Sequence, residues 1–136
     1  MIQRMSHSTI YVLDQDRAKA FYVDKLGFEL RNDVVMGTFR WLTVSPKGQP
    51  DHEMILMGIT SSPFMDEATC ATIRSLVEKG ALGPGVLGTA DCKATYAELV
   101  AKGVEFVSPP TERPYGIEAM LKDDSGNVFS MTQPFR

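Results

Sequence analysis

The stretch Ile10-Tyr11-Val12, followed by Asp16 to Lys25 and by Gly27-Phe28-Glu29-Leu30, has a second copy later in the chain. The second copy reads Val86-Leu87, Asp91 to Lys102 and Gly103-Val104-Glu105-Phe106. Each copy has the pattern of a strand, a helix, and a glycine that ends the helix before the next strand. A repeat of this length indicates two similar modules, and two such halves are expected to face each other. The sequence therefore predicts that function lies in the cleft between them.

The first module, residues 1–60, is predicted to hold one helix and four strands. Asp14-Gln15-Asp16 supplies the N-cap and the acidic first turn of the helix, and Gly27 ends it. The strands are β-branched or alternating apolar runs bounded by turn residues, at 8–13, 28–33, 39–45 and 52–58.

The second module, residues 83–136, repeats this order within the same compact domain. Its helix is predicted at 92–102. A Pro-rich loop from Ser108 to Pro114 is expected later in the same module. Its strands are predicted at 86–90, 104–107, 116–122 and 128–132. Residues 61–82 link the modules through a helix with an apolar stripe, which could be a strap packed on the outside or a lid over the cleft.

Composition limits the classes of partner. The 136 residues have a formal net charge of -3 and no basic run, which argues against nucleic acid or an anionic membrane as a partner. No apolar run approaches the roughly 20 residues of a membrane span, and Met1 to Ser6 lacks the apolar core of a signal peptide, so we expect a cytoplasmic protein. Cys70 and Cys92 lack a metal-binding spacing and are expected to be buried small hydrophobes.

Several short motifs together resemble the vicinal oxygen chelate superfamily, which includes glyoxalase I, the bleomycin-resistance proteins and the extradiol dioxygenases. The motifs are His7 to Val12, Ala20-Phe21-Tyr22 with Leu26 to Leu30, Lys102-Gly103-Val104, Arg113-Pro114-Tyr115-Gly116 and Asp123 to Asn127. The resemblance covers nearly the whole chain. It implies an α+β fold of two βαβββ modules that form a cup-shaped mixed sheet, commonly closed by a second chain in a homodimer.

The resemblance also implies where a metal would bind. In metal-dependent members, His or Glu residues on the first and last strands of each module hold a divalent ion that polarises substrate oxygens. His7 matches the first position, and the strand 52–58 leaves open whether Glu53 or Met54 faces the cleft. Gly83-Pro84-Gly85 offers no ligand at the third position, and Ser130 at the fourth brings no charge to a divalent ion. We therefore expect no complete metal site and no cofactor; His7 and Glu53 are the candidate ligands if a metal binds.

Other candidate site residues lie in both modules. Without a metal, His7 is a candidate catalytic base, because the pKa of a histidine can move across neutrality. Trp41 could floor an apolar pocket, or be a core or dimer-interface aromatic. The candidate ligand-binding residues of the second module are Arg113, Tyr115, Glu118 and Ser130. The first three follow a stiff Pro-rich segment, and their alternative role is an ion pair beside a half-buried tyrosine.

Three functions remain open at this stage. The first is a glyoxalase/bleomycin-resistance-like protein that binds a small, largely apolar or amphipathic organic molecule in the cup between the modules and sequesters it. The second is a divalent-metal-dependent enzyme, such as a glyoxalase-like lyase, an isomerase or a dioxygenase. The third is a dimeric scaffold without a ligand. A shared fold alone cannot separate them.

Overall fold

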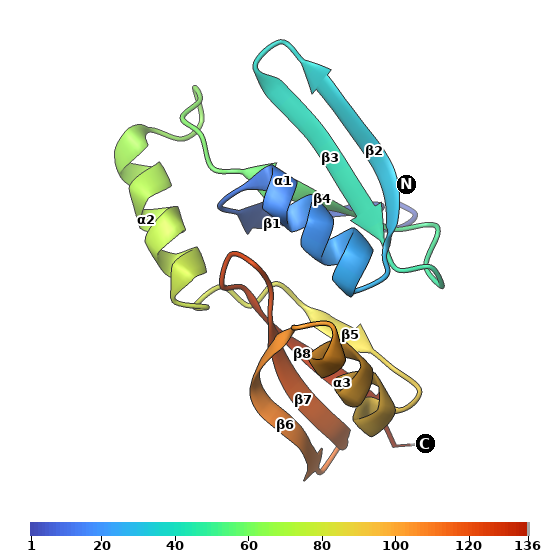
Figure 1. Cartoon of the computed structure of the whole chain (residues 1–136). Coiled ribbons are helices and arrows are strands. Elements are labelled where there is room, and N and C mark those ends of the chain that lie inside the picture. Colours follow the sequence, from blue (N-terminus) through green and yellow to red (C-terminus); the bar gives the residue numbers. More distant parts are fainter. Residues whose placement is uncertain (136) are drawn as a thin grey trace. The chain divides into compact units, whose positions relative to one another are not determined.

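The computed structural model describes residues 1–135 and divides the chain into two compact units, Met1–Ser75 and Leu76–Arg136. The division falls within helix α2 (Glu67–Glu78), part of the segment that links the two repeats (Figure 1). Each unit contains one four-stranded mixed sheet and a helix that packs on it. The predicted α+β fold of two βαβββ modules is confirmed.

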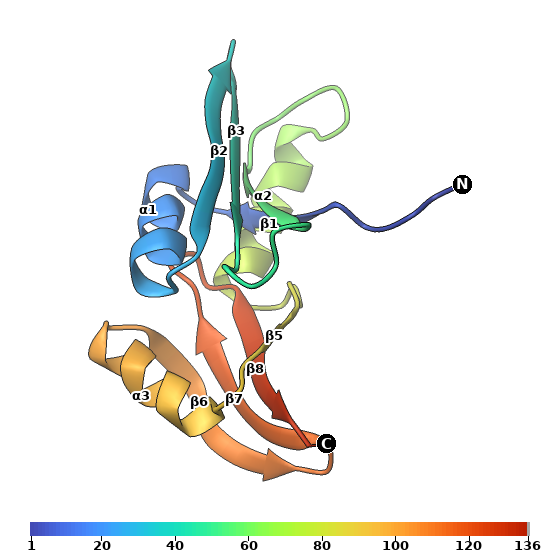
Figure 2. The same cartoon turned by 90° about the vertical axis from the view of Figure 1, so that its right-hand side faces the viewer.

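The first unit begins with β1 (His7–Val12) and helix α1 (Gln15–Ala20), which continues as the π-helical turn η1 (Phe21–Lys25). Three strands follow: β2 (Glu29–Met36), β3 (Phe39–Ser45) and β4 (Glu53–Gly58). Their order in the sheet is β1-β4-β3-β2, with β1 parallel to β4 and the other pairs antiparallel. Figure 2 shows this sheet edge-on, with α1 on one side of it.

The core of this unit lies between the sheet and α1. Asp14 caps the helix, because its side chain accepts a hydrogen bond from the backbone N–H of Arg17 at 2.9 Å. Strand side chains alternate in direction, so every second residue of β1, β3 and β4 points at the helix. The buried apolar residues of this layer are Ile10, Val12, Ala18, Phe21, Tyr22, Leu42, Val44, Met54 and Leu56.

The π-helical turn reflects a difference in length between the two repeats. The segment from the N-cap Asp14 to Gly27 is one residue longer than the segment from the N-cap Asp91 to Gly103. A π-turn accommodates one extra residue in a helix without breaking it. The first helix therefore keeps Phe21 and Tyr22 buried although it carries an insertion.

A charged cluster joins α1 to the β2–β3 hairpin. Arg40 donates from Nε and Nη2 to the two carboxylate oxygens of Asp33, at 2.8 and 3.0 Å, and Lys19 donates to Asp33 at 2.9 Å. The Arg40 guanidinium, and after it the Lys19 ammonium, hold the pKa of the Asp33 carboxyl well below its ordinary 3.8. The ionised form of Asp33 therefore stabilises the fold.

We predict that Asp33→Asn lowers the free energy of unfolding at pH 7 by about 1–3 kcal/mol. Because the folded-state pKa is depressed, this contribution is complete above about pH 4 and is lost as the pH falls through the folded-state value. The difference in the free energy of unfolding between wild type and variant should therefore be smaller in acid than at pH 7. Urea denaturation at pH 7 and at a pH below about 4 measures it. Asp24→Asn, at an exposed position on η1, is the control and should change stability little. An Asp33 variant as stable as wild type at pH 7 would contradict this account of the cluster.

The second unit holds β5 (Val86–Gly88), α3 (Cys92–Ala101), β6 (Glu105–Arg113), β7 (Gly116–Lys122) and β8 (Val128–Pro134). The sheet order is β5-β8-β7-β6, which repeats the arrangement of the first unit. Its core comprises Cys92, Leu99, Val104, Ala119, Leu121, Phe129 and Met131. Cys70 and Cys92 are both buried with free thiols, as expected from the sequence. None of the helices within residues 1–135 is long and apolar enough to cross a membrane.

The predicted Pro-rich loop from Ser108 to Pro114 is wrong, because β6 continues through Pro109 and Pro110 to Arg113. The strand lies at the edge of its sheet, and a proline is tolerated there because one side of an edge strand needs no backbone donor. Two shifts of register, between Phe106 and Ser108 and between Ser108 and Thr111, absorb the irregularity.

Candidate functional site

The sheet of the first unit has a second face, directed away from α1, which we call the first open face. Side chains of this face alternate with the core residues along each strand. It combines apolar or aromatic groups with a polar cluster at one end. Its members are His7, Thr9, Tyr11, Asn32, Val34, Met36, Phe39, Trp41, Thr43, Glu53, Ile55 and Met57. Val34, Met36 and Phe39 are 49%, 54% and 40% exposed, so apolar surface remains accessible there.

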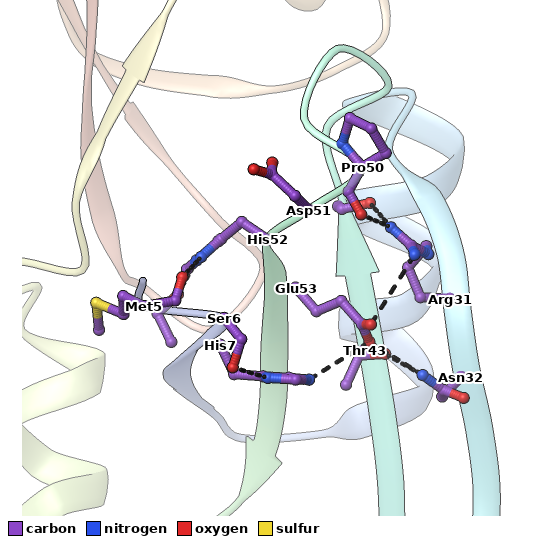
Figure 3. A network of polar contacts seen from close by, with 12 residues as sticks. Met5, Ser6, His7, Arg31, Asn32, Thr43, Pro50, Asp51, His52 and Glu53 are labelled. Atoms are coloured by element: carbon purple, nitrogen blue, oxygen red, sulfur yellow. Dashed lines mark hydrogen bonds and ion pairs between the residues drawn. The ribbon is translucent and has the colours of Figure 1, made fainter. Parts of the chain in front are cut away.

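Glu53 lies at the centre of the polar cluster (Figure 3). Its Oε1 accepts hydrogen bonds from the Thr43 hydroxyl at 2.7 Å and from the Asn32 amide at 3.0 Å. Its Oε2 lies 4.0 Å from Nη2 of Arg31. His7 stands directly opposite Glu53 in the parallel pair of β1 and β4, with Nε2 at 3.8 Å from Oε1. The register that the sequence left open is thus one in which Glu53 shares a face with His7 and Met54 is buried in the core.

Hydrogen bonding fixes the charge of this cluster. The Thr43 hydroxyl, and after it the Asn32 amide, lower the pKa of the Glu53 carboxyl below its ordinary 4.5, with the positive charge of Arg31 in support. Glu53 is therefore ionised at neutral pH, and three neighbouring groups hold it in place. His7 has its own partner, because Nδ1 lies 2.8 Å from the Ser6 hydroxyl.

A row of three rings adjoins the polar cluster. The Trp41 ring lies 5.8 Å from the His7 ring and 6.3 Å from the Phe39 ring, measured between centroids. These spacings are in the range of direct ring contact. Trp41, on β3, thus joins the polar end of the first open face to its apolar end.

Three of the four predicted residues of the second module gather around the fourth, Glu118, in the second unit. Ser130 donates to Glu118 Oε2 at 2.5 Å, and Tyr115 donates to Oε1 at 2.8 Å. Arg113 Nε lies 3.6 Å from Oε1, and the Ser130 hydroxyl also lies 2.8 Å from that of Thr132. Arg113 forms its ion pair with the same acid, Glu118, that accepts the hydrogen bond of Tyr115. A role of these two residues in ligand binding stays a prediction. That acid, Glu118, is 14% exposed, whereas Tyr115 is 54% exposed.

Glu118 is also ionised at neutral pH. The Ser130 hydroxyl, and after it the Tyr115 hydroxyl, lower the pKa of the Glu118 carboxyl below its ordinary 4.5. The hydrogen bond between Tyr115 and Glu118 also raises the pKa of Tyr115, because the phenol donates to a negatively charged carboxylate.

We predict that Ser130→Ala raises the pKa of Glu118 towards 4.5, because the variant loses the donor that contributes most to the shift. Carbon-detected NMR titration of the glutamate carboxyl groups measures this pKa directly. Thr132→Val, which keeps the Ser130 hydroxyl, should shift the pKa less. An unchanged titration in Ser130→Ala would show that the hydroxyl does not hold the carboxylate.

The seven predicted site residues therefore form two clusters, one in each unit. His7, Trp41 and Glu53 belong to the first, and the remaining four belong to the second. Sequence reasoning missed Asn32 and Thr43, the two direct donors to Glu53, and Arg31 beside it. These residues come from β2 and β3, and a register shift between Leu30 and Asn32 brings them together. His52 holds the N-terminal segment instead, with Nδ1 at 3.0 Å from the carbonyl oxygen of Met5 and Nε2 at 2.9 Å from the Ser8 hydroxyl.

Comparison with known proteins identifies the family. The model of the Glyoxalase/Bleomycin resistance protein/Dioxygenase superfamily matches residues 4–131. The chain belongs to this superfamily. It is 36% identical over 127 residues to the uncharacterized protein YurT of Bacillus subtilis (strain 168), which covers 93% of this chain and 95% of YurT.

Two solved structures are similar to this chain over nearly its whole length. UcmS2, known from its crystal structure, has 53% sequence identity to this chain and a TM-score of 0.91. The match covers 97% of this chain and 98% of UcmS2. The crystal structure of TnmS3, an antibiotic binding protein from Streptomyces sp. CB03234, is 34% identical with a TM-score of 0.78, and the match covers 98% of each chain.

The donor set does not fit the four-ligand metal site of metal-dependent superfamily members. Glu53 accepts hydrogen bonds from two neutral donors and lies beside a guanidinium, so its ionised carboxylate already has partners within the chain. Ser130 donates to Glu118 and pairs along the sheet with Val86, which has no ligating atom. Among residues 1–135, no three His, Cys, Asp or Glu side chains gather as a group that could hold a metal ion.

Proposed function

We propose that this protein binds a small, largely apolar or amphipathic organic molecule and sequesters it without changing it chemically. The observation that carries the proposal is the first open face, where accessible apolar side chains and the Trp41 ring adjoin a set of fixed polar groups. Binding sites for small molecules combine an apolar lining with a few placed polar groups in this way. The likeness to TnmS3, an antibiotic binding protein, over nearly the whole of both chains supports the same function.

The geometry favours a ligand with a ring system and a hydrogen-bonding edge. The ring row of His7, Trp41 and Phe39 suits a flat apolar group. His7 Nε2, at the polar end of this row, can donate to or accept from a hydroxyl or carbonyl of the ligand, according to the tautomer of the ring. Ile55 and Met57 extend the apolar lining along β4, and methionine adapts to irregular shapes.

The pairing of the acids favours binding over catalysis. A general base needs a lone pair directed at the substrate and a pKa near the operating pH. Glu53 and Glu118 instead each accept two hydrogen bonds from neighbouring side chains, and both have lowered pKa values. Such carboxylates are weak bases that orient neighbouring groups.

The alternative is metal-dependent catalysis by a lyase, isomerase or dioxygenase. The observation that favours it is the direct opposition of His7 and Glu53 across β1 and β4. We rank it second because these two donors would leave a weak site, and because the charge of Arg31 beside Glu53 opposes that of a cation. Metal retained by the purified protein and lost in His7→Ala would support this alternative.

A thermal-shift screen tests the proposed function. Chelator-treated protein is heated with bleomycin and with antibiotics that contain one to several fused aromatic rings. A compound that binds the folded state raises the melting temperature in proportion to the logarithm of its concentration. The proposal predicts such a rise for at least one aromatic compound and recovery of that compound unchanged. Conversion of the compound to a product would contradict sequestration.

A further inference from the structure

The acids at the centres of the two clusters differ in how their oxygens are used. Each carboxylate oxygen of Glu118 accepts a hydrogen bond, Oε2 from Ser130 and Oε1 from Tyr115. Glu53 instead accepts both of its hydrogen bonds on Oε1. Among the described residues, no donor lies within hydrogen-bonding distance of Glu53 Oε2, whose charged neighbour is Arg31 Nη2 at 4.0 Å (Figure 3). One oxygen of Glu53 thus keeps its acceptor capacity for another molecule.

A closed set of hydrogen bonds fixes the orientation of the Glu53 carboxylate. The Thr43 hydroxyl gives its single proton to Oε1. The Asn32 amide donates to Oε1 at 3.0 Å and to the Thr43 oxygen at 3.1 Å. Glu53 belongs to the first open face and its side chain is 19% exposed, so a molecule on that face can reach it. The oxygen left for such a molecule is Oε2.

The charges around Oε2 favour a neutral partner. The Arg31 guanidinium is held in place, because Nη1 donates to the Ser45 hydroxyl at 3.1 Å and to the Pro50 carbonyl oxygen at 2.8 Å. Its positive charge lies beside the negative charge of Glu53 and offsets it. A ligand cation at Oε2 would meet the repulsion of Arg31, and an anion would have no proton to donate. A neutral hydroxyl group has a proton to donate and leaves the charges balanced.

We infer that Glu53 Oε2 is the acceptor that selects the ligand, and that the ligand is a neutral aromatic compound with a hydroxyl group at its edge. The rings of the ligand lie against Trp41, and the hydroxyl donates to Oε2. The hydroxyl oxygen can also accept from His7 Nε2, which lies 3.8 Å from the other oxygen of the same carboxylate. The inference rests on the proposed function and adds to it the class of the ligand and the residue that recognises it.

Three bicyclic compounds that differ in one substituent test this selection: 6-hydroxyquinoline, 6-methoxyquinoline and quinoline-6-carboxylate. Trp41 is the only tryptophan, so its indole N–H gives a single NMR signal that reports binding at the first open face. Wild type at neutral pH should bind the hydroxy compound about tenfold more tightly than the methoxy compound, which keeps the rings but cannot donate. The carboxylate compound should also bind about tenfold more weakly than the hydroxy compound.

Glu53→Gln tests the acceptor itself. The donors Thr43 and Asn32 should hold the amide oxygen in the place of Oε1, so that the amide nitrogen replaces Oε2 and donates. The preference for the hydroxy over the methoxy compound should then fall to within about threefold, and the carboxylate compound should bind more tightly than it does to wild type. Glu67→Gln, at an exposed position in the first turn of α2, is the matched control and should keep the wild-type preference. Circular dichroism verifies that both variants are folded.

The outcomes separate this inference from the proposed function. Equal affinities of wild type for the hydroxy and methoxy compounds would overturn the inference alone, because aromatic binding would remain. A Glu53→Gln variant that keeps the full preference would also overturn it, since another acceptor would then select the hydroxyl. The wild-type comparison decides the inference even where Glu53→Gln fails to fold. Absence of binding by all three compounds would overturn the inference and would also contradict the aromatic ligand of the proposed function.

Discussion

Gly116→Ala should lower the free energy of unfolding by more than about 3 kcal/mol and leave much of the protein unfolded or insoluble. A Cβ at this position would collide with the carbonyl oxygen of Gln133 and lie 3.0 Å from Cα of Pro134. Both are backbone atoms of β8, which pairs with β7 at this point, so neither can move aside without breaking the sheet. The φ angle of +156° adds strain for any residue with a side chain.

The control for this variant is Gly48→Ala. An ideal Cβ on Gly48 has no atom within 4 Å, and its φ angle is not positive. Stability should therefore change by no more than about 0.5 kcal/mol. Denaturant unfolding followed by circular dichroism compares the two variants. A Gly116 variant as stable as the Gly48 variant would mean that β7 and β8 approach less closely than the structure indicates.

Trp41→Ala should weaken binding of a ligand found in the thermal-shift screen by about 10- to 100-fold. The side chain joins the polar and apolar ends of the first open face, and its removal deletes the central ring of the row. Trp41→Phe should have an intermediate effect because it retains a smaller ring. Isothermal titration calorimetry measures all three affinities without depending on tryptophan emission.

Phe64→Ala is the matched control for the loss of an aromatic side chain. Phe64 is 98% exposed and lies in the turn between Ser62 and Met65, outside the first open face. Its removal should leave affinity unchanged. Equal affinities of wild type and Trp41→Ala would show that the ligand binds elsewhere in the molecule.

Local patterns predicted most of the fold. The spacing of Asp14 and Gly27, and of Asp91 and Gly103, marks the start and end of each repeat helix, because capping and helix termination depend on neighbouring residues. The bounds of β3 and β7 agree with the predicted 39–45 and 116–122. The prediction was wrong for β6, where proline indicated a loop. Whether a strand occupies an edge depends on the sheet order, which local composition does not encode.

The candidate site was predicted in part. Alternation within a strand is a local property, so the neighbours that share a face with His7 on β1, or with Trp41 on β3, could be predicted. That His7 and Trp41 share one face of the sheet depends on how the strands pair. Whether Glu53 or Met54 shares the face of His7 depends on the register of β4 against β1, because a slip of one residue would exchange the faces of the two side chains. Asn32, Thr43 and Arg31 could not be predicted as partners of Glu53, because a bulge in β2 decides which side chains reach it. The close approach of the β8 backbone to Gly116 likewise depends on strand pairing, here of β7 with β8.

Titration of Trp41 emission in chelator-treated protein, followed by recovery of the ligand, tests the central claim most directly. Trp41 is the only tryptophan, so its emission reports on the first open face alone. We predict a saturable change in emission with a ligand from the screen, in the absence of metal, and recovery of the ligand chemically unchanged after the protein is denatured. Emission that responds only after a divalent metal is restored, or recovery of a converted product, would contradict sequestration and favour the metal-dependent enzyme.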